Sequence, residues 1–353
     1  MIENLVKETI RDLKPYVPND YEYKYKMDAN ESPFNVSDEM LQKIVEKIKG
    51  LEYNIYPDSD SVALRKKIAP YVGLSYENIM VGSGSDELIQ VIFNTFVDKD
   101  DVVFSHSPTF VMYSINSTIA QAKYLEYQTD EDFNLDMDSF IRQAKGSGAK
   151  LVFLCNPNNP TGNKIQRSDL VKAIEGLEAI VVVDEAYIEF GGESVIDLVG
   201  RHENLIVLRT FSKAFGFAGI RAGYLAASGL VMENLEKVKP PYNLNIASQA
   251  IAEIAVENMC IMNQNVARIT NERNRIYEVL KDIERIKVYQ SHTNFIVIRV
   301  ENSQDVFEKL LKKGIMVRSF SGGRMENRIR ITVGNKEQND AIIAALEEIL
   351  KGE

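Results

Sequence analysis

Residues 205–224 read LIVLRTFSKAFGFAGIRAGY, in which a run of four apolar residues gives way to hydroxyls, a lysine and an arginine. The Lys213 amine can form a Schiff base with an aldehyde. A phosphate group on the same molecule would suit the hydroxyls of Thr210 and Ser212 and the guanidinium of Arg221. Taken alone, the segment is also compatible with an ordinary surface lysine, so the other strand ends of the chain carry the argument.

Other segments repeat this form, with four or five apolar residues followed abruptly by polar ones. They read NIMVGSGSDE, DVVFSHSPTF, KLVFLCNPNNPTG and AIVVVDEAYIEF. Uninterrupted apolar strands with helical segments between them are typical of a parallel sheet that is covered on both faces. Ligands of such sheets bind beyond the carboxyl ends of the strands. We therefore expect residues 83–86, Asn156, Asp184 and Lys213 to converge on one crevice.

The character of the sequence changes after about residue 245, where the predicted strands alternate more and helices lie between them. We predict a three-layer α/β domain with a mostly parallel sheet over residues 31–245. A smaller α+β domain is predicted from residues 1–30 together with residues 246–353. One long helix, over about residues 246–280, is expected to bridge the two domains.

Composition excludes several classes of protein. The chain has 353 residues, 45% of them hydrophobic and 26% charged, which is enough for two cores. Its net charge of -10 disfavours general binding to nucleic acids or anionic membranes. No signal peptide or membrane span is recognisable, so a cytoplasmic location is expected. Cys155 and Cys260 are expected to be reduced, and neither cysteine nor histidine spacing predicts a metal site.

The motif GSGSDE places Gly84, Ser85 and Asp86 where a strand turns into a helix. Unpaired backbone N–H groups at such a helix start can bind a phosphate, although a simple capped turn is the alternative. Glu87 stands where a dinucleotide-binding GxGxxG motif needs its third glycine, which disfavours a nicotinamide dehydrogenase.

Four further residues follow predicted strands. Asp184 can pair with a pyridinium N–H, and a structural arginine or a metal ion is the alternative partner. Tyr187 can donate to a phenolate oxygen. Asn156 opens the rigid turn NPNNPTG, which holds its amide as a donor. Phe110 can stack on an aromatic ring; for Phe110 and Tyr187, core packing is the alternative.

Arginines in the predicted smaller domain lie at a strand end or inside an apolar strand, as in MVRSF and RIRIT. A planar guanidinium there suits bidentate capture of a carboxylate or phosphate, and an edge-strand salt bridge is the alternative. Arg318 and Arg330 are the candidates. Arg328 and Arg330 alternate onto the same face, so the sequence leaves the choice between these two open.

Together these segments resemble the fold-type I pyridoxal-phosphate enzymes of the aspartate aminotransferase superfamily, and within it the class-II histidinol-phosphate aminotransferase branch. The resemblance runs nearly from end to end. It rests on RDLKPYVP, MDANESPF, NIYPD, GSGSDE, SPTFVMY, NPNNPTG, VVDEAYIEF, RTFSKAFGFAGIRAGY and RIRITVG. The middle motifs occur across the superfamily, whereas VVDEAYIEF, TFSKAFGFAGIRAGY and RITVG are more specific to this branch.

The resemblance implies a ping-pong Schiff-base mechanism in histidine biosynthesis, in which L-histidinol phosphate and 2-oxoglutarate interconvert with imidazole acetol phosphate and L-glutamate. It implies that Lys213 binds the pyridoxal 5'-phosphate aldehyde and shuttles the proton. It implies a homodimer without nucleic-acid or membrane partners, with Tyr56 reaching the phosphate from the partner subunit. The remaining implied contacts are Asp184 to the pyridine nitrogen, Asn156 and Tyr187 to the ring oxygen, Phe110 to the ring face, Gly84, Ser85, Asp86, Thr210, Ser212 and Arg221 to the cofactor phosphate, and Tyr16, Asn156, Arg318 and Arg330 to the substrate.

Substrate identity is the part of this resemblance most open to question. MDANESPF carries Ser32 and Phe34, and Asn35 follows it, at positions where the family often has other residues; the resemblance places this arm near the substrate entrance. An aromatic aminotransferase or a threonine-phosphate decarboxylase of the same fold is the alternative. A binding or regulatory protein that keeps the fold without catalysis is a more distant one.

Overall fold

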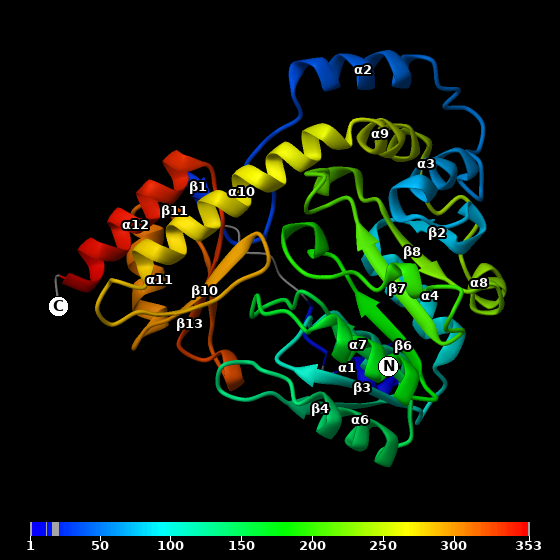
Figure 1. Ribbon diagram of the computed structural model, residues 1–353, viewed down its shortest axis with the longest axis horizontal. Coiled ribbons are helices and arrows are strands. Elements are labelled where there is room, and N and C mark those ends of the chain that lie inside the picture. Colours follow the sequence, from blue (N-terminus) through cyan, green and yellow to red (C-terminus); the bar gives the residue numbers. More distant parts are fainter. Residues whose placement is uncertain (1, 12, 16–20, 352–353) are drawn as a thin grey trace.

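The computed structural model describes residues 2–11, 13–15 and 21–351, and its largest element is a seven-stranded sheet (Figure 1). The strand order is β2-β8-β7-β6-β5-β3-β4. Six of these strands run in one direction, and β8 runs in the opposite direction. The strands are β2 (Ile79–Gly82), β3 (Val102–Ser107), β4 (Lys123–Gln128), β5 (Ala149–Cys155), β6 (Ile180–Asp184), β7 (Leu205–Thr210) and β8 (Gly223–Ala227). The predicted α/β fold with a mostly parallel sheet is confirmed.

Successive residues of the central strands enter two separate apolar clusters, one on each face of the sheet. In β5, Leu151 and Phe153 belong to one cluster, while Val152 and Leu154 belong to the other. All four side chains are 0% exposed. Burial of such a side chain stabilises a fold by roughly 1.5–3 kcal/mol, so a strand without polar positions is stable only when helices cover both of its faces.

Helices on both sides complete the three layers (Figure 1). Side chains of α4 (Gly84–Phe96), α5 (Met112–Ala120) and α8 (Gly229–Glu236) join the cluster on one face. The other cluster receives side chains of α2 (Asp38–Lys49), α3 (Val62–Val72), α6 (Met137–Gly146) and α7 (Arg167–Gly176). Short 3-10 helices lie at Ile2–Leu5, Tyr76–Asn78, Ile188–Phe190, Ile196–Leu198, Ala218–Ile220 and Gly323–Met325.

The prediction of a single helix over residues 246–280 is wrong, because the chain forms two helices there, α9 (Ile246–Glu257) and α10 (Met259–Leu280). Asn258 separates them, with φ -115° and ψ 36°. Its side-chain amide donates to the carbonyl oxygen of Ile254 at 2.8 Å. An asparagine side chain competes in this way with the backbone for hydrogen bonds, which ends one helix and turns the next.

A second, antiparallel sheet has the order β12-β13-β10-β9. Its strands are β9 (Lys287–Tyr289), β10 (Phe295–Arg299), β12 (Arg318–Phe320) and β13 (Arg328–Thr332), and α10, α11 (Ser303–Lys312) and α12 (Lys336–Lys351) accompany it. Near the N-terminus, α1 (Glu8–Arg11) precedes β1 (Tyr25–Lys26), which pairs in parallel with β11 (Ile315–Met316). The domain limits at residues 30 and 245 stay a prediction, which this pairing and the separate second sheet support.

None of the helices in the described ranges combines the length and the apolar character that a bilayer span requires.

Gly223 in β8 lies close against the backbone of the turn that begins α4. It lies opposite Gly82 of β2 and Thr210 of β7. A Cβ atom on Gly223 would stand 2.7 Å from the backbone nitrogen of Ser85 and 3.0 Å from the carbonyl oxygen of Arg209. Backbone atoms cannot move aside as a side chain can, so this position requires glycine.

We predict that Gly223→Ala lowers the free energy of unfolding by about 1–3 kcal/mol, because overpacking displaces the turn from the strand. Urea denaturation followed by circular dichroism measures this change. Gly229→Ala is the matched control, since its Cβ would meet nothing within 4 Å and alanine favours the helix that it begins. Equal stability of the two variants would contradict the close contact.

Candidate active site

The carboxyl ends of β2, β3, β5, β6 and β7 meet at one edge of the large sheet. Asp184 ends β6, and the backbone N–H of Asn156, which follows β5, donates to its carbonyl oxygen at 2.8 Å. Thr210 at the end of β7 and Gly82 at the end of β2 both lie opposite Gly223. The polar segments that the sequence places after separate strands are therefore brought together.

Lys213 follows β7 and is partly buried at this edge. Its Nζ donates to the carbonyl oxygen of Ala29 at 3.1 Å and lies 5.8 Å from the centre of the Tyr187 ring. Burial, and then the positive charge of Arg330, lower the pKa of Lys213 to about 8. A substantial fraction of the amine is then unprotonated near neutral pH, as a nucleophile or base requires.

Asp184 is 3% exposed, and both of its carboxylate oxygens accept hydrogen bonds. The Tyr113 hydroxyl donates to Oδ2 at 2.7 Å, and the Ala186 backbone N–H donates to Oδ1 at 3.1 Å. Burial raises the pKa of Asp184 to about 6, although both donors oppose the rise. A buried carboxylate of this kind is stabilised further by a cationic partner, such as a pyridinium N–H.

Asn156 and Tyr187 present polar groups beside this carboxylate. The Asn156 Oδ1 accepts from the backbone N–H of Ile165 at 2.7 Å. Its buried Nδ2 has no hydrogen-bond partner among the described residues. The Tyr187 hydroxyl oxygen accepts from Asn30 Nδ2 at 2.9 Å, which leaves its own proton for another acceptor. An oxygen of a bound molecule would satisfy both donors.

Phe110 follows β3 and is partly buried against the cluster that contains α4 and α5. Its ring meets the ring of Tyr113 edge to face, with centroids 5.7 Å apart. Phe110 can therefore pack in the core and still stack on a bound aromatic ring, because only part of its own ring is covered.

The start of α4 and Arg221 form the predicted phosphate region. Gly84 has φ +81°, and a Cβ there would stand 2.9 Å from Arg221 Nη2. Arg221 Nη2 also lies 3.0 Å from Asp86 Oδ2, with both side chains nearly half exposed. The Thr210 hydroxyl accepts from the backbone N–H of Ser212 at 3.1 Å. A guanidinium beside a helix N-terminus suits a dianion, and the Asp86 carboxylate holds that guanidinium in place.

Contacts of the second sheet distinguish Arg328 from Arg330, the two arginines between which the sequence left the choice open. Arg330 donates from Nη1 to Asn159 Oδ1 at 2.6 Å and from Nη2 to the carbonyl oxygen of Asp28 at 2.7 Å, so it reaches the NPNNPTG loop and the N-terminal arm. Arg328 instead lies over the rings of Phe133 and Tyr289. These contacts favour Arg330.

Arg318 lies directly opposite Arg330 in the pairing of β12 with β13, so both arginines share one face. Two guanidinium groups on one face have the chemistry to bind a carboxylate or phosphate.

Two predicted contacts lie apart from this group. Tyr56 is 77% exposed and stacks on Tyr242, with ring centroids 4.4 Å apart. Within one chain it therefore lies at the surface. Tyr16 lies outside the described residues.

The sequence reasoning missed Tyr113 and Asn30, which hold Asp184 and Tyr187. Tyr113 stands three residues after Phe110, and this helical spacing was an available signal. Asn30 lies in the motif MDANESPF, but nothing local indicates that it contacts a residue 157 positions away.

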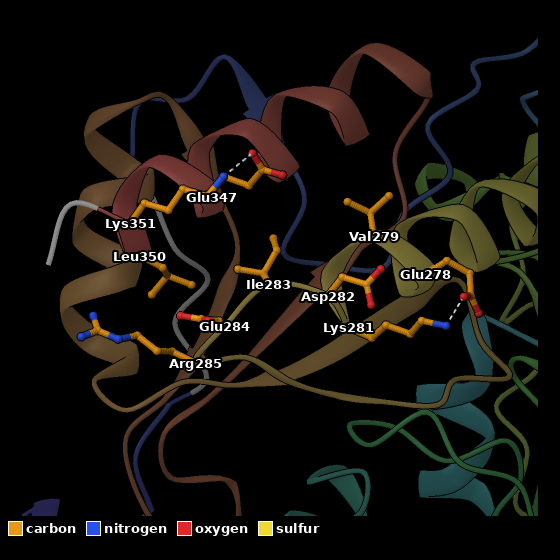
Figure 2. A pocket seen from close by; sticks show the side chains of 10 residues that line it. All are labelled: Glu278, Val279, Lys281, Asp282, Ile283, Glu284, Arg285, Glu347, Leu350 and Lys351. Carbon is orange, nitrogen blue, oxygen red and sulfur yellow. Dashed lines mark hydrogen bonds and ion pairs between the residues drawn. The ribbon is translucent and has the colours of Figure 1, made fainter.

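The residues fit the phosphorylated pyridine aldehyde that the sequence predicts. The unpartnered amide of Asn156, the buried carboxylate of Asp184 and the region around Arg221 match its ring oxygen, ring nitrogen and phosphate. The pocket drawn in Figure 2, of about 810 Å³, is a different place. The ends of α10 and α12 line it with charges of both signs, and it contains none of the predicted site residues.

Comparison with known proteins agrees with this geometry. The family model for aminotransferase class I and II matches residues 22–346. A histidinol-phosphate aminotransferase of Caldanaerobacter subterraneus subsp. tengcongensis is 46% identical over 351 residues, covering 99% of this chain and 100% of the relative.

Solved structures with lower identity share the fold. The histidinol-phosphate aminotransferase of Sinorhizobium meliloti, in complex with pyridoxal-5'-phosphate, has a TM-score of 0.91 at 24% identity and covers 98% of both chains. The L-threonine-O-3-phosphate decarboxylase of Porphyromonas gingivalis has a TM-score of 0.82 at 23% identity, covering 93% of this chain and 99% of that one. On the extent of the family match and the full-length identity, the chain belongs to the class I and II aminotransferase family.

Proposed function

We propose that this protein is a pyridoxal-phosphate-dependent histidinol-phosphate aminotransferase of histidine biosynthesis. It would interconvert L-histidinol phosphate and 2-oxoglutarate with imidazole acetol phosphate and L-glutamate. The observation that carries the proposal is the convergence of a lysine of lowered pKa, a buried aspartate and a guanidinium at a helix start on one sheet edge. The full-length similarity to a relative that carries this name supports the choice of substrate.

The described residues provide a place for each part of the cofactor. Lys213 would bind its aldehyde, Asp184 its ring nitrogen, and Asn156 with Tyr187 its ring oxygen. Phe110 would cover one ring face. Its phosphate would lie among Gly84, Ser85, Asp86, Thr210, Ser212 and Arg221. When bound, pyridoxal phosphate supplies an electrophilic carbon and a ring that accepts electrons from the substrate Cα.

Lys213 is the residue that would move the proton. Its Nζ lies beside the Tyr187 ring and the Ala29 carbonyl, and its pKa of about 8 lets it both accept and release a proton near neutral pH. Arg330 contributes to this lowered pKa through its positive charge. The residue that binds substrate anions thus also adjusts the base.

Arg330 and Arg318 would bind the substrates in turn. The reaction needs one site that accepts the carboxylate of glutamate in one half-reaction and the phosphate of histidinol phosphate in the other. A guanidinium presents a planar fork of N–H donors that suits both groups, whereas an ammonium is a point charge. The two arginines are neighbours on one face of the sheet, where β12 pairs with β13, and each provides such a fork of donors.

The same fold supports other reactions, so products must be measured. Turnover with histidinol phosphate and 2-oxoglutarate, yielding glutamate, supports the proposal. Faster turnover of phenylalanine indicates an aromatic aminotransferase. Release of carbon dioxide from threonine phosphate without a keto-acid product indicates a decarboxylase, and contradicts the proposal.

A cytoplasmic homodimer is part of the proposal. Exposed aromatic and aliphatic side chains gather in residues 53–56, where Tyr53, Ile55 and Tyr56 are 62%, 54% and 77% exposed. Tyr242, on which Tyr56 stacks, is 45% exposed. Apolar groups this exposed favour burial against another surface, and a second copy of the chain would bury them while bringing Tyr56 to the partner's phosphate region.

We predict that Lys213→Ala abolishes transamination and the visible absorption band of the protein loaded with cofactor, because both depend on the Schiff base that the Lys213 amine would form. Turnover assays and absorbance spectra measure both effects, and circular dichroism checks the fold. Lys237→Ala is the control, since its Nζ donates to Asn234 Oδ1 at the exposed end of α8, away from the candidate site residues. A Lys213→Ala variant with normal turnover would refute the proposal.

The pKa of Lys213 predicts how the rate of cofactor capture depends on pH. Only the unprotonated amine attacks an aldehyde, so the rate at which cofactor-free protein captures pyridoxal phosphate should rise with pH and level off above about 8. Stopped-flow absorbance measures this rate. A midpoint near 10.5, the ordinary value of a lysine, would show that burial and Arg330 do not act on the amine.

We predict that Arg330→Ala raises KM at least tenfold for both glutamate and histidinol phosphate, which is about 1.4 kcal/mol of binding free energy for each. Steady-state kinetics with each substrate measure the effect. Arg328→Ala is the matched control, because its guanidinium lies over Phe133 and Tyr289 instead. Loss with only one substrate, or equal losses in the two variants, would contradict a shared anion site at Arg330.

A further inference from the structure

Tyr113 is a buried residue that the reaction itself does not require. It lies in the first turn of α5, is 0% exposed, and donates its hydroxyl hydrogen to Asp184 Oδ2 at 2.7 Å. We propose that Tyr113 is a positioning residue, which orients the Asp184 carboxylate and keeps it ionised for its cationic partner. This inference rests on the proposed function only for the identity of that partner, and its effect on Asp184 is measurable in the cofactor-free chain.

The position of the Tyr113 ring is determined by its neighbours. Its ring stacks on Phe153 of β5, with centroids 4.3 Å apart and planes 13° apart. Its other contact is edge to face with Phe110, at 5.7 Å. Both contacts depend on the ring and neither depends on the hydroxyl. Removal of the oxygen alone therefore leaves the packing of Phe110 intact.

The surroundings of Asp184 explain why one hydroxyl matters. Burial, and the negative charges of Asp86 and Glu185, favour the neutral carboxylic acid. The largest influences that favour the ionised form are hydrogen bonds from Tyr113 and from the Ala186 N–H. The titratable groups that face Asp184 from the elements around it are Asp86 of α4, Tyr113 of α5, Cys155 of β5, Glu185, and Tyr187 in the following turn.

The pKa of Asp184, about 6, lies close to neutral pH, so the balance is easily changed. Without the Tyr113 hydroxyl, burial acts against one remaining donor and the carboxyl group should stay protonated to higher pH. A protonated Asp184 carries no charge to pair with a pyridinium N–H. Tyr113 would thereby influence the affinity for the cofactor without contacting it.

The experiment compares Tyr113→Phe with wild type, and with Tyr289→Phe as the matched control. Tyr289 is also buried, and its hydroxyl has no hydrogen-bond partner among the described residues. Infrared spectra of cofactor-free full-length protein with 13C-labelled aspartate follow the ionisation of Asp184, whose band is identified by its absence in Asp184→Asn. We expect the pH at which half of Asp184 is ionised to rise by about one unit in Tyr113→Phe and to stay unchanged in Tyr289→Phe.

A second measurement is the dissociation constant of pyridoxal phosphate as a function of pH. We expect it to be about threefold higher in Tyr113→Phe at pH 6.5, with the difference closing above pH 8.5 as Asp184 ionises in both proteins. A merely structural role would weaken binding by the same factor at every pH. Equal Asp184 midpoints, or a loss of affinity independent of pH, would overturn the proposal.

Fluorinated tyrosine at position 113 keeps the proposal testable if Tyr113→Phe does not fold. Its hydroxyl is a stronger donor in the same shape, so the Asp184 midpoint should fall, and an unchanged midpoint would overturn the positioning role. The infrared experiment needs no cofactor. Failure of the proposed function therefore appears separately, as a wild-type protein that does not bind pyridoxal phosphate.

Discussion

The burial of both faces of the seven-stranded sheet is the constraint on which the site depends. The apolar residues of the central strands pack into one of two apolar clusters, where an unpaired charge would be costly. Charged chemistry is therefore confined to the strand ends. Glu185 and Arg209 are charged and buried next to Asp184. They form an ion pair at 2.8 Å, so neither of these two charges is left unpaired.

The same exclusion of water acts on the site residues in opposite directions. Burial raises the pKa of Asp184 and lowers that of Lys213, so an acid and a base of very different ordinary strength approach each other near neutral pH. Perturbed pKa values with specific partners around them cluster at functional sites. One physical cause thus shifts both pKa values in the direction that the proposed roles of these residues require.

Much of this could be predicted from the sequence, and the limits have physical reasons. Apolar runs and strand direction were sufficient to place Asn156, Asp184 and Lys213 at one edge, because parallel strands end together. The choice between Arg328 and Arg330 needed the contacts across the second sheet, which no local pattern contains. The break at Asn258 was missed because a side-chain hydrogen bond ended an otherwise continuous helical pattern. The roles assigned to individual site residues remain proposals.

The N-terminal arm has a consequence for how the protein is made. Residues 28–30 supply the carbonyls that Arg330 and Lys213 contact and the amide that holds Tyr187. Asn30 in turn is anchored by Thr332 and Asn294. During synthesis on a ribosome the arm emerges well before its anchors, because residues 28–30 precede Asn294 and Thr332 in the chain. A nascent chain can thus form most of the large sheet first, while its candidate active site is completed only after Thr332 has left the exit tunnel.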